Sequence, residues 1–209
     1  MSRLLYVNSS PRNDRSYSSS AAAAFLEAYR AANPEDEIEK LDLWTVELPR
    51  FAGETLAAKY ATMRKLNFTP EQEASWSAVL SVIDHFTSFD KMVFSIPMWN
   101  FNVPYVLKHY IDILVQPSVT YGIDAQGKLG GFIRGKKAIC ICAAGSLYDE
   151  AAPLAPGDFL RPYLKWIFRW IGIDDLQIEL VSPTTKGDDA AAKALDRSIM
   201  ICRDLAKTF

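Results

Sequence analysis

The run Lys91-Met-Val-Phe-Ser-Ile-Pro-Met-Trp-Asn-Phe-Asn-Val-Pro104 decides the fold of this chain. Its apolar first half predicts a buried strand, and the residues that follow, 104–115, predict an amphipathic helix with proline at its first position. The apolar positions of that helix recur at i, i+3, i+4 and i+7, namely Leu107, Tyr110, Ile111 and Leu114. The loop between strand and helix is predicted to bind a planar ligand beyond the strand's carboxyl end. The alternative is a turn whose Trp99 and Phe101 only cap the core.

Strand-like and helix-like patterns alternate along the whole chain. Strands are predicted at residues 3–8, 37–43, 91–96, 136–143 and 176–181. Helices are predicted at residues 17–32, from 70 onward, at 104–115, 159–171 and 188–207, with a short one near 55–65 in the ambiguous segment 44–68. Five strands that alternate with about five helices imply a parallel sheet covered on both faces. No internal repeat or flexible linker divides the sequence, so one domain is expected over residues 1–209.

The composition limits the classes of partner. A net charge of −2 over 209 residues argues against nucleic acid or an anionic membrane as the main partner. No apolar run is long enough to span a bilayer, and the first strand begins with no signal-peptide pattern before it. Three cysteines, Cys140, Cys142 and Cys202, cannot form a closed disulfide framework, so buried free thiols are expected. These features predict a cytoplasmic protein.

The loop after the first predicted strand is rich in hydroxyl groups and leads into a helix. Unpaired amides and the positive dipole end at a helix start favour a phosphate group. Ser10, Ser16 and Ser18 could add side-chain donors, and Arg12 and Arg15 could add positive charge. The sequence lacks the glycine-rich motifs for nucleoside triphosphates and for dinucleotides. A single phosphate site is one hypothesis, and an ordinary serine cap with solvated arginines is the other.

A third loop, Ala143-Ala144-Gly145-Ser146, follows the fourth predicted strand, and its small residues allow the backbone to approach a ligand closely. No nucleophile-elbow pattern surrounds Ser146, so a hydrolase is not indicated. The two histidines, His85 and His109, have no metal-ligand spacing and are expected on the surface. Three ligand-compatible loops without evident acid–base or nucleophilic residues indicate that a bound cofactor performs the reaction.

Several motifs together resemble the FMN-dependent NADH azoreductases, also described as FMN-dependent NADH:quinone oxidoreductases. The most specific motif is Pro97-Met98-Trp99-Asn100-Phe101, followed by Leu107-Lys108-x-x-x-Asp112. Further matches are Ser9-Ser10, Ser16-Tyr17-Ser18, Gly135-Lys136-Lys137-Ala138, Pro162-Tyr163-Leu164 and Ile171-Gly172-Ile173. The resemblance covers essentially the whole chain, and it implies a flavodoxin-like α/β fold with a five-stranded parallel sheet in the order 2-1-3-4-5.

The resemblance also implies roles for individual residues. The FMN phosphate would be held by Ser10, Ser16, Tyr17 and Ser18. The isoalloxazine ring would be held by Met98, Trp99, Asn100 and Phe101 and by the loop Ala143, Ala144, Gly145 and Ser146. That second loop departs from the family, which usually has Ser or Thr and more glycine there, so backbone groups are left for ring binding. Tyr121 is expected in the wall of the substrate cavity.

For activity, the resemblance implies a two-step exchange. NADH or NADPH reduces the flavin and leaves, and an azo compound or a quinone is then reduced at the same site. No protein residue is then an obligatory catalytic group, and no metal is expected. A homodimer with a flavin at the subunit boundary is also implied, and the helix predicted at 159–171 is apolar on more than one side, as partner-covered helices are. A flavodoxin-type electron carrier and a fold that has lost its flavin site are the alternatives.

Overall fold

A five-stranded parallel sheet forms the centre of the computed structural model, which describes residues 1–12 and 15–209. Asn13 and Asp14, in the loop rich in hydroxyl groups, lie outside the described residues. The strands, in spatial order, are β2 (Glu37–Asp42), β1 (Arg3–Asn8), β3 (Lys91–Pro97), β6 (Lys137–Ala143) and β7 (Asp175–Val181). Counted along the chain, these main strands lie in the order 2-1-3-4-5, so the expected sheet is confirmed.

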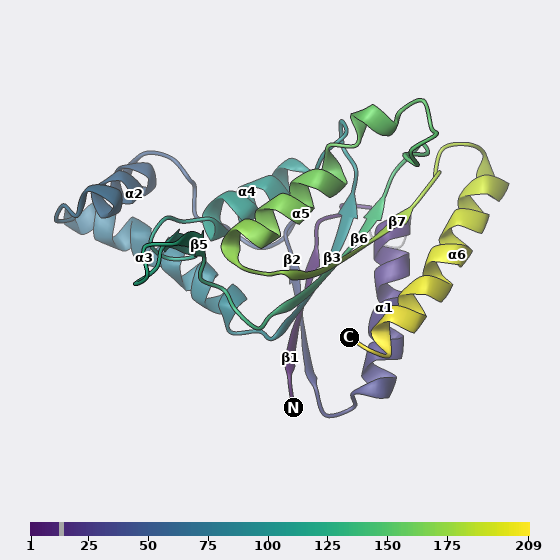
Figure 1. Ribbon diagram of the computed structural model, residues 1–209, viewed down its shortest axis with the longest axis horizontal. Coiled ribbons are helices and arrows are strands. Elements are labelled where there is room, and N and C mark those ends of the chain that lie inside the picture. The colour runs from purple at the N-terminus through teal and green to yellow at the C-terminus, as the bar shows by residue number, and fades with distance from the viewer. Residues whose placement is uncertain (13–14) are drawn as a thin grey trace.

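Helices cover both faces of this sheet (Figure 1). One face is covered by α1 (Tyr17–Ala32) and α6 (Asp188–Ala206), and the other by α3 (Pro70–Thr87), α4 (Tyr105–Leu114) and α5 (Leu160–Ile171). A further helix, α2 (Glu54–Arg64), packs on α3 away from the sheet (Figure 1). Within the described residues, no helix combines the length and the apolarity that crossing a membrane would require.

The signals that start and orient the helices are visible as hydrogen bonds and burial. The Gln72 N–H donates to Thr69 Oγ1 at 3.3 Å, and the Thr69 N–H donates to Gln72 Oε1 at 3.2 Å, so a capping box starts α3 where the sequence predicts a helix from residue 70 onward. The expected apolar face of α4 is buried against the sheet and its neighbours, namely Leu107, Tyr110, Ile111 and Leu114. Both helix predictions are therefore confirmed, and α4 fixes the loop that precedes it at the sheet's edge.

A small antiparallel hairpin between α4 and β6 is not foreseen by the sequence patterns. It consists of β4 (Tyr121–Ile123) and β5 (Leu129–Gly131). The hairpin is fixed on the end of α5, where the Ile133 N–H donates to the Ile171 carbonyl oxygen at 3.0 Å. A Cβ atom on Gly131 would overlap the Ile171 carbonyl group, so this close contact requires glycine.

Helix α5 is covered on one side by its own chain, and the expected partner on its other side stays a prediction. One face is buried in the core, namely Leu160, Leu164, Phe168 and Ile171. Outside that face, Trp166 is 67% exposed, and its indole stacks on Trp170 with ring centroids 6.4 Å apart. An exposed indole on an otherwise well-packed helix leaves an apolar surface that the chain itself does not cover.

Candidate functional site

The three loops singled out in the sequence meet at the carboxyl edge of the sheet. The Ser9 N–H, just beyond β1, donates to the Ser95 carbonyl oxygen of β3 at 3.1 Å. The Met98 N–H, just beyond β3, donates to the carbonyl oxygen of Ala143 at the end of β6 at 2.7 Å. Neighbouring strands in the order β1-β3-β6 therefore bring the predicted phosphate loop and both predicted ring loops side by side.

The predicted phosphate serines surround the first turn of α1. Ser16 is the N-cap, and its Oγ accepts from the Ser19 N–H at 3.2 Å and lies 3.2 Å from Ser18 Oγ. Ser10, Ser16 and Ser18 are all buried, whereas Tyr17 is half-buried and packs against the core. The serine cap that was the alternative to a phosphate site is thus present. It does not compete with a phosphate site, because a helix start offers several amides and a positive dipole end to an anion.

A buried asparagine that sequence reasoning missed organises this loop. Asn8 Oδ1 accepts from the Ser10 N–H at 3.3 Å, from Ser19 Oγ at 3.1 Å and from Ser95 Oγ at 2.9 Å. Its Nδ2 donates to Asp42 Oδ2 at 3.0 Å. One side chain therefore ties together β1, the first turn of α1, the end of β2 and β3. An asparagine at the end of an otherwise apolar strand was the signal in the sequence.

The loop after β3 forms a tight turn with two strained residues. Trp99 and Asn102 exchange two backbone hydrogen bonds, of 2.8 Å from the Trp99 N–H and 3.0 Å from the Asn102 N–H. The two residues between them have positive φ, 46° at Asn100 and 69° at Phe101. Asparagine tolerates this left-handed conformation, but a phenylalanine there is an outlier, and such outliers cluster at functional sites. The backbone N–H groups of Asn100 and Phe101 have no acceptor within the described residues.

The loop after β6 is held by its carbonyl groups, which leaves two amides available. The Ala144 carbonyl oxygen accepts from Thr184, and the Gly145 carbonyl oxygen accepts from the Thr185 N–H at 3.1 Å and Oγ1 at 2.9 Å. The Gly145 and Ser146 N–H groups have no acceptor among the described residues.

Two backbone groups of the loop after β6 are already paired within the sheet edge. The Ala143 carbonyl already accepts from Met98, and the Ala144 N–H donates to the Val181 carbonyl oxygen at 3.0 Å. These pairings hold the loop in place, so the free amides come from Gly145 and Ser146. The division also depends on Thr184 and Thr185, some 40 residues away along the chain.

We expect Gly145→Val to displace the loop after β6. A Cβ atom at Gly145 would lie 3.0 Å from Thr185 Oγ1 and 3.1 Å from its Cγ2, and valine adds two further methyl groups. The two free amides would move with the loop, so binding of a ligand that accepts from them should weaken about tenfold or more, since one hydrogen bond contributes about 1 kcal/mol and the loop shift affects both. Titration of the variant with the ligand measures this, and an unchanged dissociation constant would contradict the assignment. Thr185→Ala in the same background is the control, because it removes the obstacle and should restore part of the affinity.

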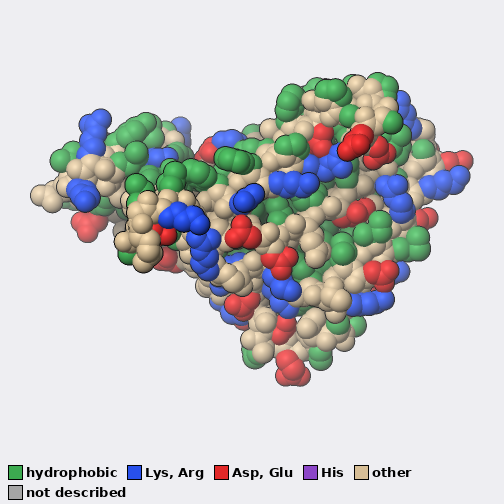
Figure 2. Space-filling model, in the orientation of Figure 1, with side chains coloured by type: hydrophobic (Ala, Val, Ile, Leu, Met, Phe, Trp, Pro, Cys, Tyr) green, Lys and Arg blue, Asp and Glu red, His purple; other side chains and the backbone are tan. Residues whose placement is uncertain are grey.

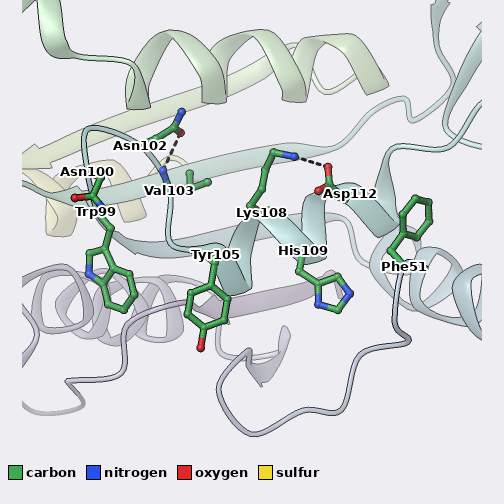
Figure 3. A pocket seen from close by; sticks show the side chains of 9 residues that line it. All are labelled: Phe51, Trp99, Asn100, Asn102, Val103, Tyr105, Lys108, His109 and Asp112. Atoms are coloured by element: carbon green, nitrogen blue, oxygen red, sulfur yellow. Dashed lines mark hydrogen bonds and ion pairs between the residues drawn. The ribbon is translucent and has the colours of Figure 1, made fainter. Parts of the chain in front are cut away.

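A polar and aromatic pocket of about 700 Å³ lies beside the strained turn (Figure 3). It is lined by Phe51, Trp99, Asn100, Asn102, Val103, Tyr105, Lys108, His109 and Asp112. Its charged groups are paired, because Lys108 Nζ lies 2.6 Å from Asp112 Oδ1. His109 Nε2 lies 2.9 Å from the Pro49 carbonyl oxygen. The pocket therefore offers flat apolar walls with amide edges, which suits a planar organic molecule.

Of the predicted site residues, Trp99 and Asn100 line this pocket, and Tyr121 and Phe101 are two of those that lie outside it. Tyr121 starts β4, and its ring lies 5.1 Å from that of Trp170, so it is not brought to the turn within this chain. Phe101 is 44% exposed and its ring covers Gly157, where a Cβ atom would approach to 3.2 Å. The role of Tyr121 as a cavity wall stays a prediction.

The cysteine thiols and His85 lie away from the three loops or are buried in the core. Burial raises the pKa of the Cys140 and Cys142 thiols far above the physiological range, and it raises the pKa of Cys202 to about 12. These thiols are therefore protonated and poor nucleophiles. His85 Nε2 lies 2.7 Å from Glu39 Oε1 of β2, outside the three loops. Of the two histidines expected on the surface, only His109 lies in the wall of the pocket.

Known proteins resemble this chain over nearly its full length. A family model described as "Flavodoxin-like fold" matches residues 2–200. An "FMN-dependent NADH:quinone oxidoreductase" of Nitratidesulfovibrio vulgaris is 37% identical over 93% of this chain and 92% of its own length. "FMN-dependent NADH:quinone oxidoreductase 9" of Burkholderia lata is 38% identical, with both chains fully covered. The crystal structure of an azoreductase from Bacillus anthracis superposes with a TM-score of 0.90 at 25% identity, again over both whole chains.

Proposed function

Since the chain belongs to the family of FMN-dependent NADH:quinone oxidoreductases and azoreductases, we propose that it transfers electrons from NADH, through bound FMN, to quinones or azo compounds. The observation that carries this proposal is the meeting of a helix start with four unpaired amides at one edge of the sheet. FMN has a phosphate at one end and a ring edge of carbonyl and nitrogen acceptors at the other. The donors of the site match both ends.

The residues divide between these two ends of the cofactor. The start of α1, with Ser10, Ser16, Tyr17 and Ser18, would hold the phosphate. The turn at Met98 to Phe101 and the amides of Gly145 and Ser146 would hold the ring. The turn at Asn100 and Phe101 supports this division, because its strained backbone leaves both N–H groups without an acceptor within the described residues.

When bound, FMN would supply the redox chemistry between NADH and the acceptor, and the protein would supply orientation and electrostatics. Fixed amide donors beside the ring would stabilise negative charge on it without rearranging. The unpaired amides of Asn100, Phe101, Gly145 and Ser146 are suited to that task. With buried, protonated thiols and a His85 bound to Glu39, no side chain is required as a nucleophile.

The pocket beside the turn favours a reductase of small molecules over a carrier that docks to proteins. Its volume of about 700 Å³ suits a planar acceptor, and its walls include Trp99 and Tyr105. An electron carrier usually relies on charge steering toward its partner, whereas this chain has a net charge of only −2. Turnover of NADH and a quinone without any second protein separates the two classes of function.

A homodimer is the second part of the proposal. The exposed Trp166 and its stacked neighbour Trp170 give α5 an apolar surface that a second copy would bury. Hydrophobic side chains also gather near Lys and Arg side chains over α5 and the hairpin (Figure 2). An acceptor cavity completed by a second subunit would also account for Tyr121, which lies next to Trp170 and apart from the pocket of its own chain.

We also propose a single domain and a reducing compartment for this chain. The family match over residues 2–200 and the continuous sheet support one domain over residues 1–209. The three free, buried thiols support a reducing compartment such as the cytoplasm.

Steady-state kinetics test the proposed reaction. If oxidised nicotinamide leaves before the acceptor enters the same site, double-reciprocal plots against NADH at several quinone concentrations should be parallel. Intersecting lines, together with evidence that both substrates bind at once, would contradict a shared site. His85→Ala is the control, because His85 pairs with Glu39 of β2, outside the three loops. The turnover of this variant should stay within a fewfold of the wild type. An inactive His85→Ala protein with normal FMN content would show that the flavin does not act alone.

A further inference from the structure

Trp44 contacts both the predicted phosphate loop and the turn that follows β3. It lies just after β2, where its backbone N–H donates to Asp42 Oδ1 at 3.0 Å. Its indole Nε1–H donates to the Ser9 carbonyl oxygen at 3.0 Å. Because Ser9 begins the loop that leads to α1, this hydrogen bond fixes the indole to the phosphate side of the site.

The same indole packs behind the aromatic wall of the pocket. The centroid of its ring lies 5.8 Å from that of Trp99 and 5.5 Å from that of Tyr105. The contact with Tyr105 is nearly perpendicular, at 84°, which is a favourable edge-to-face arrangement. Trp99 and Tyr105 both line the pocket shown in Figure 3, whereas Trp44 does not.

The wall rings depend on this support because they are otherwise open to solvent. Tyr105 is 66% exposed and Trp99 is 38% exposed, whereas Trp44 is half-buried between them and the loop. Trp99 also begins the strained turn, so a shift of its ring would move the backbone that carries the free amides. The indole is also bonded to the β1 loop at Ser9.

We propose that Trp44 is a positioning residue that sets the pocket wall at a fixed place relative to the phosphate loop. This inference rests on the proposed flavin site. The indole has two separable attachments, a hydrogen bond to Ser9 and an aromatic contact with Trp99 and Tyr105. The first governs how the cofactor is held, and the second governs how a planar substrate is held.

The two attachments can be removed one at a time. Trp44→Phe keeps a ring against Trp99 but removes the Nε1–H donor to Ser9. Trp44→Leu removes both. The matched control is Trp76→Phe, because Trp76 is a buried tryptophan of α3 outside the three loops and the pocket, and its replacement reports the cost of losing an indole from the core. Each protein is stripped of flavin and titrated with FMN, its melting temperature is recorded, and KM and kcat for a quinone are measured after reloading.

We expect Trp44→Phe to raise the FMN dissociation constant about 3- to 10-fold, the effect of one neutral hydrogen bond, with little change in the quinone KM. Trp44→Leu should raise the FMN dissociation constant and also raise KM about 3- to 10-fold, the effect of a lost aromatic pair, while kcat stays within about twofold. Trp76→Phe should lower the melting temperature and leave both constants unchanged.

Three results would overturn the inference. Wild-type values of the FMN dissociation constant and KM in both Trp44 variants would show that the contacts do not position the site. If Trp76→Phe raised the FMN dissociation constant as much as Trp44→Phe for the same loss of melting temperature, the effect of Trp44→Phe would report only the loss of an indole from the core. Should Trp44→Leu fail to fold, Trp44→Phe alone decides through its FMN dissociation constant. Wild-type apoprotein that takes up no FMN would overturn the proposed function, and the inference with it.

Discussion

If the proposed dimer buries Trp166, replacing this residue with glutamate is expected to give a folded monomer. Trp166 is 67% exposed within one chain, so a carboxylate there remains hydrated and costs the monomer little stability. In a dimer that buries this indole, the same carboxylate would lose its water without gaining a partner, which costs several kcal/mol per site. A twofold interface contains the substitution twice, so its free-energy cost is doubled.

Light scattering coupled to size-exclusion chromatography measures this directly, with the far-ultraviolet circular dichroism spectrum as the test of folding. Met200→Glu is the matched control, because Met200 is 62% exposed on α6, on the other face of the sheet, and should leave the dimer intact. A wild-type protein that is monomeric and fully active would refute the proposed dimer. A Trp166→Glu protein that stays dimeric would place the interface elsewhere.

The double variant Ser16→Ala/Ser18→Ala is expected to lose FMN affinity by a factor of about 100 or more. Hydrogen bonds to a charged group contribute about 1.5–3 kcal/mol each, and two hydroxyl donors at the start of α1 are removed together. The structure adds a second effect, since Ser16 is the N-cap of α1 and its loss costs about 1 kcal/mol of stability. Fluorescence titration of the apoprotein with FMN gives the affinity, and a thermal melt gives the stability.

Ser20→Ala separates the two effects in the same helix. The Ser20 hydroxyl donates to the Ser16 carbonyl oxygen at 2.9 Å, so its removal alters a helix bond without touching the two serines' hydroxyl groups. We expect its FMN affinity to stay within a fewfold of the wild type. A double variant with unchanged FMN affinity would mean that the phosphate lies elsewhere, whatever happens to its melting temperature.

The sheet and most helices could be predicted because their signals are local. The i, i+3, i+4, i+7 pattern from Leu107 to Leu114 and the cap at Thr69 each lie within one element, and the structure has both. The hairpin at 121–131 has strands of only three residues, and its position depends on the contact between Gly131 and α5. No local pattern specifies such a contact.

The sequence predicted which loops form the site, but not their backbone conformations or the contacts between them. The motif around Trp99 identifies the turn, yet nothing in it indicates that Phe101 has a φ of 69°, since glycine is the usual sign of that conformation. The role of Asn8 depends on Asp42 and Ser95, which lie 34 and 87 residues further along the chain. Trp44 was missed for the same reason, because its partners come from two other loops.

The hydrogen bonds of Asn8 have a consequence for how a ligand would be received. They join four elements within the polypeptide itself, so the loop at Ser10 acquires its shape when the chain folds. The conformational entropy lost in shaping that loop is then part of the free energy of folding and does not weaken association. The apoprotein is therefore preorganised at this loop. We expect the loop to keep the same conformation when the cofactor binds and when it leaves.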